Sequence, residues 1–298
     1  MSALKELQKI QTKNNSMICL GLDIDPKRMP PDYAKGTKAM FDFCRRVIDA
    51  TADVVCAYKP NLAFYECLGA EGWSLLTQIM ARIPDEIPVI IDAKRGDIGN
   101  TASFYADALF DQLQADWVTL NPYMGYDSLR PFLEYKDKGI FVLCLTSNPG
   151  AKDFQLLHVD GIPLYRVVAE KVYYWNKDHN CGLVVGATVP GQLKEIRQIA
   201  GDMPLLIPGV GTQGGSIDKA AVLGTDNFRR TAVINVSRSV LYASREEDFA
   251  QKARQELILL NKTIDALRPT GKPSSEPDKK PAAEAPPPNK PDQPQAGL

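Results

Sequence analysis

The fold can be worked out from one stretch, Val89-Ile90-Ile91-Asp92-Ala93-Lys94-Arg95-Gly96-Asp97-Ile98-Gly99-Asn100-Thr101, in which three apolar β-formers lead directly into a cluster of charges. This pattern is typical of a buried strand that ends at a polar site. Because alternate side chains of a strand share a face, we expect Asp92 and Lys94 to point the same way. Asp97 is expected at the N-cap or in the first turn of a helix over about 98–114. In isolation the motif would suggest surface ion pairs, but the apolar run before it favours a functional site.

The same apolar run, stopped by a polar residue or proline, occurs eight times, at about 16–23, 54–59, 89–94, 117–121, 139–145, 183–188, 205–207 and 232–236. Segments of helical period accompany them, at 4–13, 37–52, 62–82, 98–114, 127–136, 163–178, 191–200, 216–223 and 247–267. Strands that are apolar on both faces belong to parallel sheets. Eight β-then-α units therefore predict an α/β protein with a (β/α)₈ TIM barrel, and a doubly wound open sheet is the alternative.

All strands of such a barrel end on one face, so side chains that are far apart in the sequence meet there. The residues expected at this face are Asp23, Lys59, Asp92, Lys94, Ser147 and Arg238. Taken singly, a strand-end charge such as Asp23 or Lys59 would be a solvated surface group. The common face makes one site of them.

A glycine-rich loop, Pro208-Gly209-Val210-Gly211-Thr212-Gln213-Gly214-Gly215-Ser216, follows the seventh strand and precedes a helix. Glycines let backbone N–H groups approach an anion, and the loops after strands 7 and 8 commonly bind phosphate in barrels. Arg238, just after the eighth strand, adds a planar cationic fork. Although a glycine-rich loop alone could simply make a turn, the combination with Ser237-Arg238 predicts a phosphate site.

A phosphate site at one end and an acid–lysine–acid array at the other suit a phosphorylated substrate whose carbon becomes negatively charged near Lys94. Lys94 could protonate that carbon, and neighbouring carboxylates would keep its ammonium charged and oriented. Repulsion from Asp92 would be relieved if the substrate lost a carboxylate as CO₂. The residues alone do not exclude a Schiff base on Lys94.

The chain carries, in order, the motifs Tyr58-Lys59-Pro60-Asn61, Asp92-Ala93-Lys94-Arg95-Gly96-Asp97-Ile98-Gly99-Asn100-Thr101, Pro208-Gly209-Val210-Gly211-Thr212-Gln213-Gly214-Gly215 and Ser237-Arg238. This ordered set resembles orotidine 5′-phosphate decarboxylases of the longer bacterial type, over about residues 15–265. The resemblance implies a homodimeric barrel that converts orotidine 5′-monophosphate to uridine 5′-monophosphate in pyrimidine biosynthesis, without metal or organic cofactor.

The resemblance also implies roles for individual residues. The charged catalytic array would be Lys59, Asp92, Lys94 and Asp97, with Lys94 as the proton donor. Asp97 and Thr101 would come from the partner subunit, so that the two active sites are shared. The substrate would contact Asp23 and Thr101 at the ribose, Ser147 at the pyrimidine, and Pro208, Gln213 and Arg238 at or near the phosphate. No role is assigned to the segment 121–125.

Two other functions remain open. Within the same suprafamily, keto-gulonate phosphate decarboxylases and hexulose phosphate synthases share the D-x-K-x-x-D strand end but use magnesium. A non-catalytic barrel that binds phosphate is the other alternative, although such a protein would have no use for buried alternating charges.

Composition limits the partners and the location. The 298 residues, 44% of them hydrophobic, can bury a full core, and the net charge of -1 predicts no binding to nucleic acid or to an anionic membrane. The sequence shows no signal segment and no apolar run of membrane-spanning length. Six cysteines without a C-x-x-C pair indicate reduced core thiols, and two histidines without ligand spacing indicate no zinc site. We therefore expect a cytoplasmic protein.

The composition changes at Pro269, since nine of the last 30 residues are proline and none is aromatic. Such a segment cannot bury enough apolar surface to offset the entropy of ordering. We therefore expect a barrel domain at 1–268 and a disordered, proline-rich tail or linker at 269–298.

Overall fold

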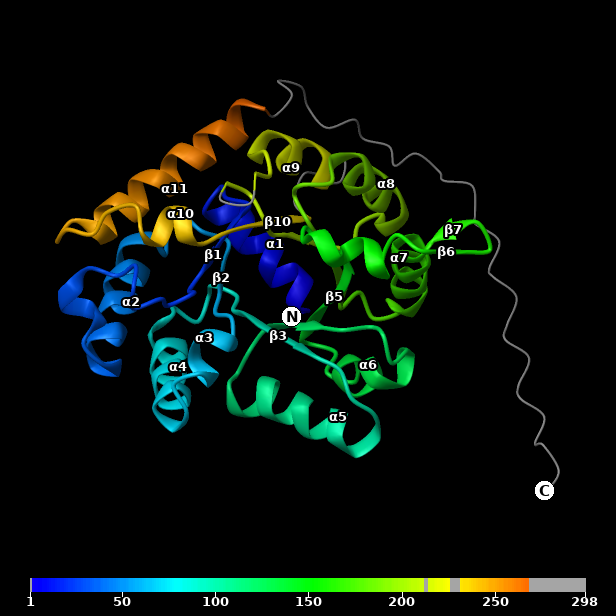
Figure 1. Cartoon of the computed structure of the whole chain (residues 1–298), viewed down its shortest axis with the longest axis horizontal. Helices are drawn as coiled ribbons and strands as arrows, with labels where there is room; N and C mark the ends of the chain where they lie inside the picture. The colour runs from blue at the N-terminus through cyan, green and yellow to red at the C-terminus, as the bar shows by residue number, and fades with distance from the viewer. Residues whose placement is uncertain (1, 212–213, 226–230, 268–298) are drawn as a thin grey trace.

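Eight parallel strands form a barrel at the centre of the structure, a computed structural model that describes residues 2–211, 214–225 and 231–267 (Figure 1). The strands are β1 (Ile18–Gly21), β2 (Ala57–Lys59), β3 (Ile90–Arg95), β4 (Trp117–Leu120), β5 (Gly139–Leu145), β8 (Cys181–Val185), β9 (Leu205–Ile207) and β10 (Ala232–Val236). They lie in the order β2-β1-β10-β9-β8-β5-β4-β3. The predicted tail and Gln213 fall outside the described residues.

The two ends of this strand order meet, which closes the sheet. Parallel bridges join Tyr58 to Val89 and Asn61 to Asp92, and the amide of Asp92 donates to the carbonyl of Pro60 at 3.0 Å. The barrel prediction is confirmed, and the open doubly wound sheet is excluded. Closure places Lys59, at the end of β2, beside the carboxyl-terminal half of β3.

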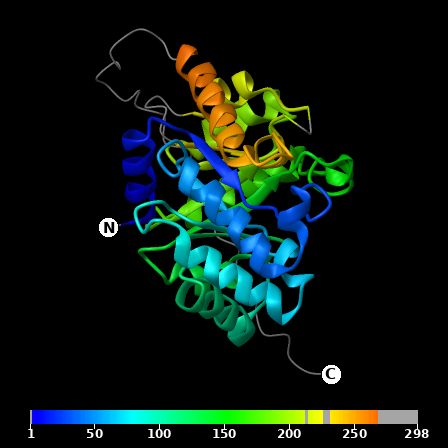
Figure 2. The ribbon, with the colours of Figure 1, turned by 90° about the vertical axis from the view of Figure 1, so that its left-hand side faces the viewer.

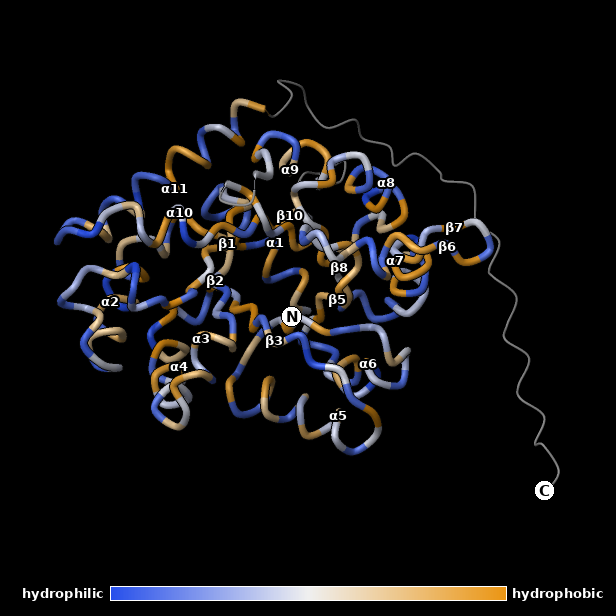
Figure 3. Tube along the Cα trace, in the orientation of Figure 1, coloured by the Kyte–Doolittle hydropathy of each residue, from blue (hydrophilic) through white to orange (hydrophobic). Residues whose placement is uncertain are grey.

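Helices surround the barrel, and their tubes alternate between polar and apolar turns while the strands are largely apolar (Figure 3). The long helices are α2 (Thr37–Thr51), α4 (Ala70–Arg82), α5 (Gly99–Ala106), α6 (Tyr126–Leu133), α7 (Leu164–Trp175), α8 (Pro190–Ala200), α9 (Ile217–Gly224) and α11 (Phe249–Ala266). Most strand residues are fully buried because they face either the barrel interior or these helices.

The helix α1 (Ala3–Lys13) covers the end of the barrel at which the strands begin. In α1, Leu7 and Ile10 are buried, and the side-chain amide Nε2 of Gln11 donates to the carbonyl of Ala232 at the start of β10, at 2.7 Å. The helix lies to one side of the barrel when the molecule is turned (Figure 2). The amino ends of the strands are thus closed by α1, whereas their carboxyl ends carry the predicted site.

Several local features differ from the sequence-based expectations. The segment 62–82 is two helices, α3 (Ala63–Glu66) and α4, because the backbone turns at Gly69, which has φ +63°. The segment 98–114 begins as α5 and continues as a π-helix, η2 (Asp107–Gln112). Short elements that the periodicity did not predict are η1 (Pro31–Ala34), η3 (Pro149–Asp153), the antiparallel hairpin β6 (His158–Val159) and β7 (Ile162–Pro163), and α10 (Arg238–Leu241).

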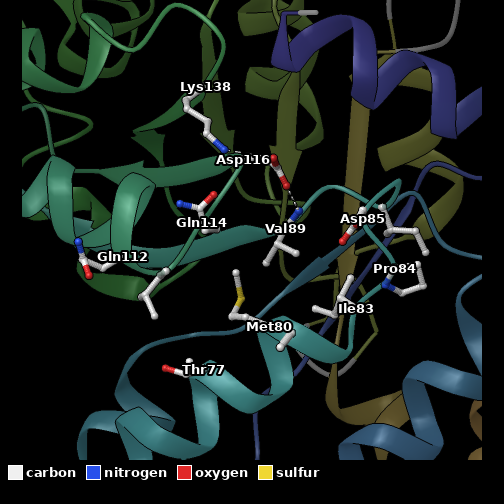
Figure 4. A pocket seen from close by; sticks show the side chains of 13 residues that line it. Thr77, Met80, Ile83, Pro84, Asp85, Val89, Gln112, Gln114, Asp116 and Lys138 are labelled. Atoms are coloured by element: carbon white, nitrogen blue, oxygen red, sulfur yellow. Dashed lines mark hydrogen bonds and ion pairs between the residues drawn. The ribbon is translucent and has the colours of Figure 1, made fainter.

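A cavity opens at the amino ends of the strands, between α4 and the segment that follows η2 (Figure 4). Its floor is apolar, with Met80 and Ile83, and its polar side holds Asp116. The Asp116 carboxylate accepts from the amide of Val89 at 2.9 Å and lies 3.5 Å from the Lys138 ammonium. These contacts join β3, β4 and β5 where the strands begin. The predicted site lies at the other end of the same strands.

Packing inside the barrel leaves no room for a side chain at Gly139. A Cβ there would lie 2.3 Å from a ring carbon of the buried Trp117. We expect Gly139→Ala to lower the free energy of unfolding by about 1–3 kcal/mol, because the indole and its neighbours must shift. Urea unfolding measures this, with Gly191→Ala as the control, since a Cβ at Gly191 meets nothing within 4 Å. Equal stability of the two variants would contradict the packing argument.

Candidate active site

Two lysines and one aspartate meet at the carboxyl ends of β2 and β3. The Lys59 ammonium lies 3.0 Å from Asp92 Oδ2, and the Lys94 ammonium lies 2.6 Å from Asp92 Oδ1. Both oxygens of one carboxylate are therefore paired with cations. The predicted contact between Asp92 and Lys94 is present, and Lys59 joins them because the barrel closes between β2 and β3.

Burial strengthens these interactions. The side chains of Lys59 and Asp92 are 4% and 11% exposed, whereas that of Lys94 is 47% exposed. Burial alone would raise the pKa of Asp92, but Lys59 and Lys94 outweigh it and hold this pKa well below its usual range. Burial would likewise lower the pKa of Lys59, but Asp92 and then Asp23 raise it above its usual value. Asp92 is thus a fixed anion and Lys59 a fixed cation, and the more accessible ammonium is that of Lys94.

Lys94 does not have the regular strand backbone that the alternation rule assumed. Its φ is +48°, in the left-handed region, and the register of β3 against β4 shifts between Ile91 and Arg95. The Lys94 amide donates to the hydroxyl of Thr119 at 3.0 Å. The expectation that Asp92 and Lys94 point the same way is met, but by an irregular strand end rather than by simple alternation.

Asp97 and Thr101 follow the array but do not join it within the described chain. Ile98, not Asp97, is the N-cap of α5, and Asp97 lies one residue before it, accepting from the amide of Ile98 at 2.8 Å. The prediction that Asp97 caps the helix or lies in its first turn is therefore wrong by one residue. Within the described ranges Asp97 has no ion pair with Lys59 or Lys94, and Thr101 is exposed on α5.

Asp23 lies in the loop after β1, close enough to Lys59 for its carboxylate to raise the pKa of the Lys59 ammonium. The Asp23 carbonyl accepts from the hydroxyl of Tyr242 at 2.7 Å, and the same hydroxyl accepts from the amide of Asp25. Tyr65 likewise donates to the carbonyl of Leu22 at 2.8 Å. Two tyrosines thus hold the backbone on both sides of Asp23, while its buried Oδ1 has no hydrogen-bond partner in the described part of the chain.

Two further buried oxygens near β1 also lack partners among the residues that the structure describes: Oδ1 of Asn235 and Oγ of Ser237. They lie close to Gly21, where an added Cβ would come within 2.9 Å of Ser237. Buried polar atoms are normally hydrogen-bonded, so unpaired oxygens at the strand ends are available to a ligand. Sequence reasoning missed Asn235 and Thr119, although each is the polar residue inside an otherwise apolar strand.

The glycine-rich loop leaves β9 through Pro208 and folds back on itself. Gly209, Gly211 and Gly214 have positive φ values between +78° and +96°, and the Gly211 amide donates to the carbonyl of Gly215 at 3.1 Å. A Cβ at Gly215 would lie 2.5 Å from that of Ala187, so this loop packs closely against the loop after β8.

Arg238 and Ser147 follow β10 and β5, which are separated in the barrel by β9 and β8. Arg238 is the first residue of α10, directly after β10, and β10 is adjacent to β9. Ser147 follows β5 and contacts the next loop, since a Cβ at Gly186 would lie 2.9 Å from that of Ser147. Asp23, Lys59, Asp92, Lys94, Ser147 and Arg238 thus all follow or end barrel strands on one face, as predicted, and Pro208 follows β9 on the same face.

The remaining candidate groups are elsewhere. All six cysteines are unpaired, and only Cys67 is exposed. His158 and His179 are both exposed. In the described ranges no three His, Cys, Asp or Glu side chains are grouped so as to hold a metal ion, and no helix there is long and apolar enough to cross a membrane.

The chain is similar to known proteins over most of its length. The family model "Orotidine 5'-phosphate decarboxylase / HUMPS family" matches residues 16–253. Orotidine 5'-phosphate decarboxylases of Herpetosiphon aurantiacus and Cupriavidus necator are 52% and 48% identical, over 85% and 90% of this chain and 94% and 99% of theirs.

Solved structures agree. The Leishmania donovani OMP decarboxylase superposes with a TM-score of 0.77 at 40% identity, covering 88% of this chain and 99% of that one. The Leishmania donovani UMP synthase gives a TM-score of 0.81 at 41% identity, covering 90% of this chain but only 56% of that longer chain. The shared fold, the matched motifs and the identity over most of the chain show that this protein belongs to the orotidine 5'-phosphate decarboxylase / HUMPS family.

Proposed function

We propose that this protein decarboxylates orotidine 5′-monophosphate to uridine 5′-monophosphate, a step of pyrimidine biosynthesis. The observation that carries the proposal is the Lys59–Asp92–Lys94 array, in which a half-exposed ammonium is held by a buried carboxylate at the barrel mouth. Relatives at about half identity bear the name of this enzyme. Loss of orotidine monophosphate, followed by ultraviolet absorbance, tests the proposal directly.

The chemistry assigns one task to each charge. The bond between C6 of the pyrimidine and its carboxylate breaks, CO₂ leaves, and the electron pair remains on C6. The Lys94 ammonium then protonates C6, since it is the accessible cation of the array. The fixed negative charge of Asp92 repels the substrate carboxylate and is relieved of that repulsion when CO₂ departs.

The substrate contacts are assigned to the positions of this chain that match the motifs of the family. We assign the ribose to Asp23 and Thr101, the pyrimidine to Ser147, and the phosphate to Gln213 and Arg238, with Pro208 lining the phosphate side. The unpaired Oδ1 of Asp23 supports its role. Because β9 and β10 are neighbours in the barrel, the glycine-rich loop after β9 and Arg238 after β10 can share a single phosphate site.

We further propose a homodimer with shared active sites. The loops and helices after β3, β4 and β5, which are adjacent strands, expose large apolar side chains: Ile98, Phe104, Tyr105, Tyr123, Met124, Tyr126, Phe154, Leu156 and Leu157. Large apolar side chains gathered on the loops and helices of adjacent strands are typical of a protein–protein interface. A second copy docked there would bring Asp97 toward the partner's lysines. The segment 121–125, for which the sequence analysis assigned no role, would contribute Tyr123 and Met124 to this surface.

We propose that the reaction needs neither metal nor organic cofactor, and that the protein works in the cytoplasm, where its unpaired buried cysteines stay reduced. The family also includes enzymes that act on other sugar phosphates, for which magnesium would be required. Turnover of orotidine monophosphate that persists in a chelator favours the decarboxylase, whereas turnover of a hexulose phosphate that stops in a chelator favours the alternative.

The first prediction concerns the proton donor. We expect Lys94→Ala to lower kcat to background, because C6 then has no acid within reach, while the protein still folds, since Lys59 and the Thr119 hydroxyl continue to bond Asp92. Lys194→Ala, which removes an exposed lysine from α8, serves as the control. A Lys94→Ala variant that keeps a near-wild-type rate would refute the assignment.

The second prediction concerns the phosphate. We expect Arg238→Ala to raise KM by about 10- to 100-fold, because charge-assisted hydrogen bonds contribute roughly 1.5–3 kcal/mol each. Arg82→Ala, which removes a surface arginine paired with Asp49 on α2, should leave KM unchanged. Steady-state kinetics decide, and a KM that hardly moves would place the phosphate elsewhere.

The third prediction tests the shared site. Lys94→Ala and Asp97→Ala are each expected to be inactive, yet mixing them should create dimers in which one pocket takes Lys94 from one chain and Asp97 from the other. With random exchange about half the dimers are mixed, so activity should approach about a quarter of the wild-type value per site. If verified subunit exchange restores nothing, Asp97 works in the pocket of its own chain.

A further inference from the structure

The hydroxyl of Thr119 links the backbone of Lys94 to the carboxylate of Asp92. Thr119 lies in β4 and is 1% exposed. Its Oγ1 accepts from the Lys94 amide at 3.0 Å and donates to Asp92 Oδ1 at 2.8 Å. Since the Lys94 ammonium reaches the same Oδ1 at 2.6 Å, the three residues form a closed ring of hydrogen bonds that includes both the main chain and the side chain of Lys94.

The ring acts where the backbone is strained. A left-handed conformation costs a non-glycine residue about 1–2 kcal/mol, and Lys94 has φ +48°. Because the register of β3 against β4 shifts here, the Lys94 amide donates to the side chain of Thr119 and not to a backbone carbonyl of the neighbouring strand. A strained residue persists only when its surroundings fix it, and here the fixing contact is one hydroxyl from the neighbouring strand.

We propose that Thr119 is a positioning residue, whose hydroxyl fixes the left-handed backbone of Lys94 and the orientation of the Asp92 carboxylate and so aims the Lys94 ammonium at the substrate. The inference rests on the proposed function, in which Lys94 donates the proton. Thr119 is fully buried in β4, and its hydroxyl bonds the Lys94 amide and Asp92 rather than facing the open side of the site. Its loss should therefore affect the chemical step and spare substrate binding.

The alternative is that Thr119 merely fills space in the barrel. Thr119→Val keeps the shape and removes the hydroxyl, leaving the Lys94 amide without its acceptor and Asp92 without one donor. Thr119→Ser keeps the hydroxyl and removes a methyl group. A space-filling role predicts that the serine variant is the worse enzyme, and a positioning role predicts the reverse.

The experiment compares kcat and KM of these variants on orotidine monophosphate, after turnover by the wild type has been established. We expect Thr119→Val to lower kcat by about 100-fold, because a misplaced catalytic group of this kind costs about that factor, with KM within about threefold of the wild type. Thr119→Ser should stay within about threefold in both. Without wild-type turnover the proposed function itself fails, which separates the two failures.

Controls keep the test decisive. Thr51→Val removes another fully buried hydroxyl, which lies on α2, bonds the Val47 carbonyl and the Tyr58 hydroxyl, and makes no bond to Lys59, Asp92 or Lys94 in the described part of the chain; kcat should stay unchanged. If Thr119→Val does not fold, Thr119→Ala replaces it and is compared with Thr119→Ser, since these two differ by one oxygen. The inference is overturned if the variant without the hydroxyl keeps kcat within about twofold of its partner, or if KM rises in place of the fall in kcat.

Discussion

A buried carboxylate held between two ammonium groups is the constraint on which the rest of this site depends. Taking Asp92 out of water is costly unless both its oxygens are paired, and Lys59 and Lys94 pair one each. This requires β2 and β3 to be neighbours, and because they are the two ends of the strand order in this sheet, closure of the barrel brings them together. The array then carries one net positive charge, from two cations and one anion, and so favours an anionic substrate.

The three charges differ in freedom, and that difference assigns their tasks. Lys59 is almost fully buried, and its raised pKa keeps it a permanent counter-ion. Lys94 is half-exposed on an irregular strand end and alone can meet a substrate. A lysine that changed rotamer freely would seldom point at the substrate. Asp92 restrains the Lys94 ammonium, and Thr119 restrains the Lys94 backbone.

Much of this was visible in the sequence, because buried parallel strands have a distinctive apolar pattern and end at polar residues. The barrel and the meeting of Lys59, Asp92 and Lys94 could therefore be predicted. Periodicity could not show the break at Gly69 or the hairpin β6–β7, because a single positive φ and two-residue strands leave no periodic signal. It also missed Thr119, since the partner of a left-handed backbone depends on strand register.

The two acids of the D-x-K-x-x-D motif are used differently within one chain: Asp92 pairs with both lysines, and Asp97 pairs with neither in the described ranges. Lys94 is half-exposed, while Asp97, only three residues away, bonds the Ile98 amide and has no ion pair with either lysine in the described part of the chain. The apolar side chains that follow β3, β4 and β5 border the same strand ends. In the proposed dimer, burying this border would also bury Lys94, and a cation losing water needs a second carboxylate. Two-fold symmetry would supply this carboxylate to both sites, because a contact that places Asp97 of one subunit beside Lys94 of the other also places the second Asp97 beside the first Lys94.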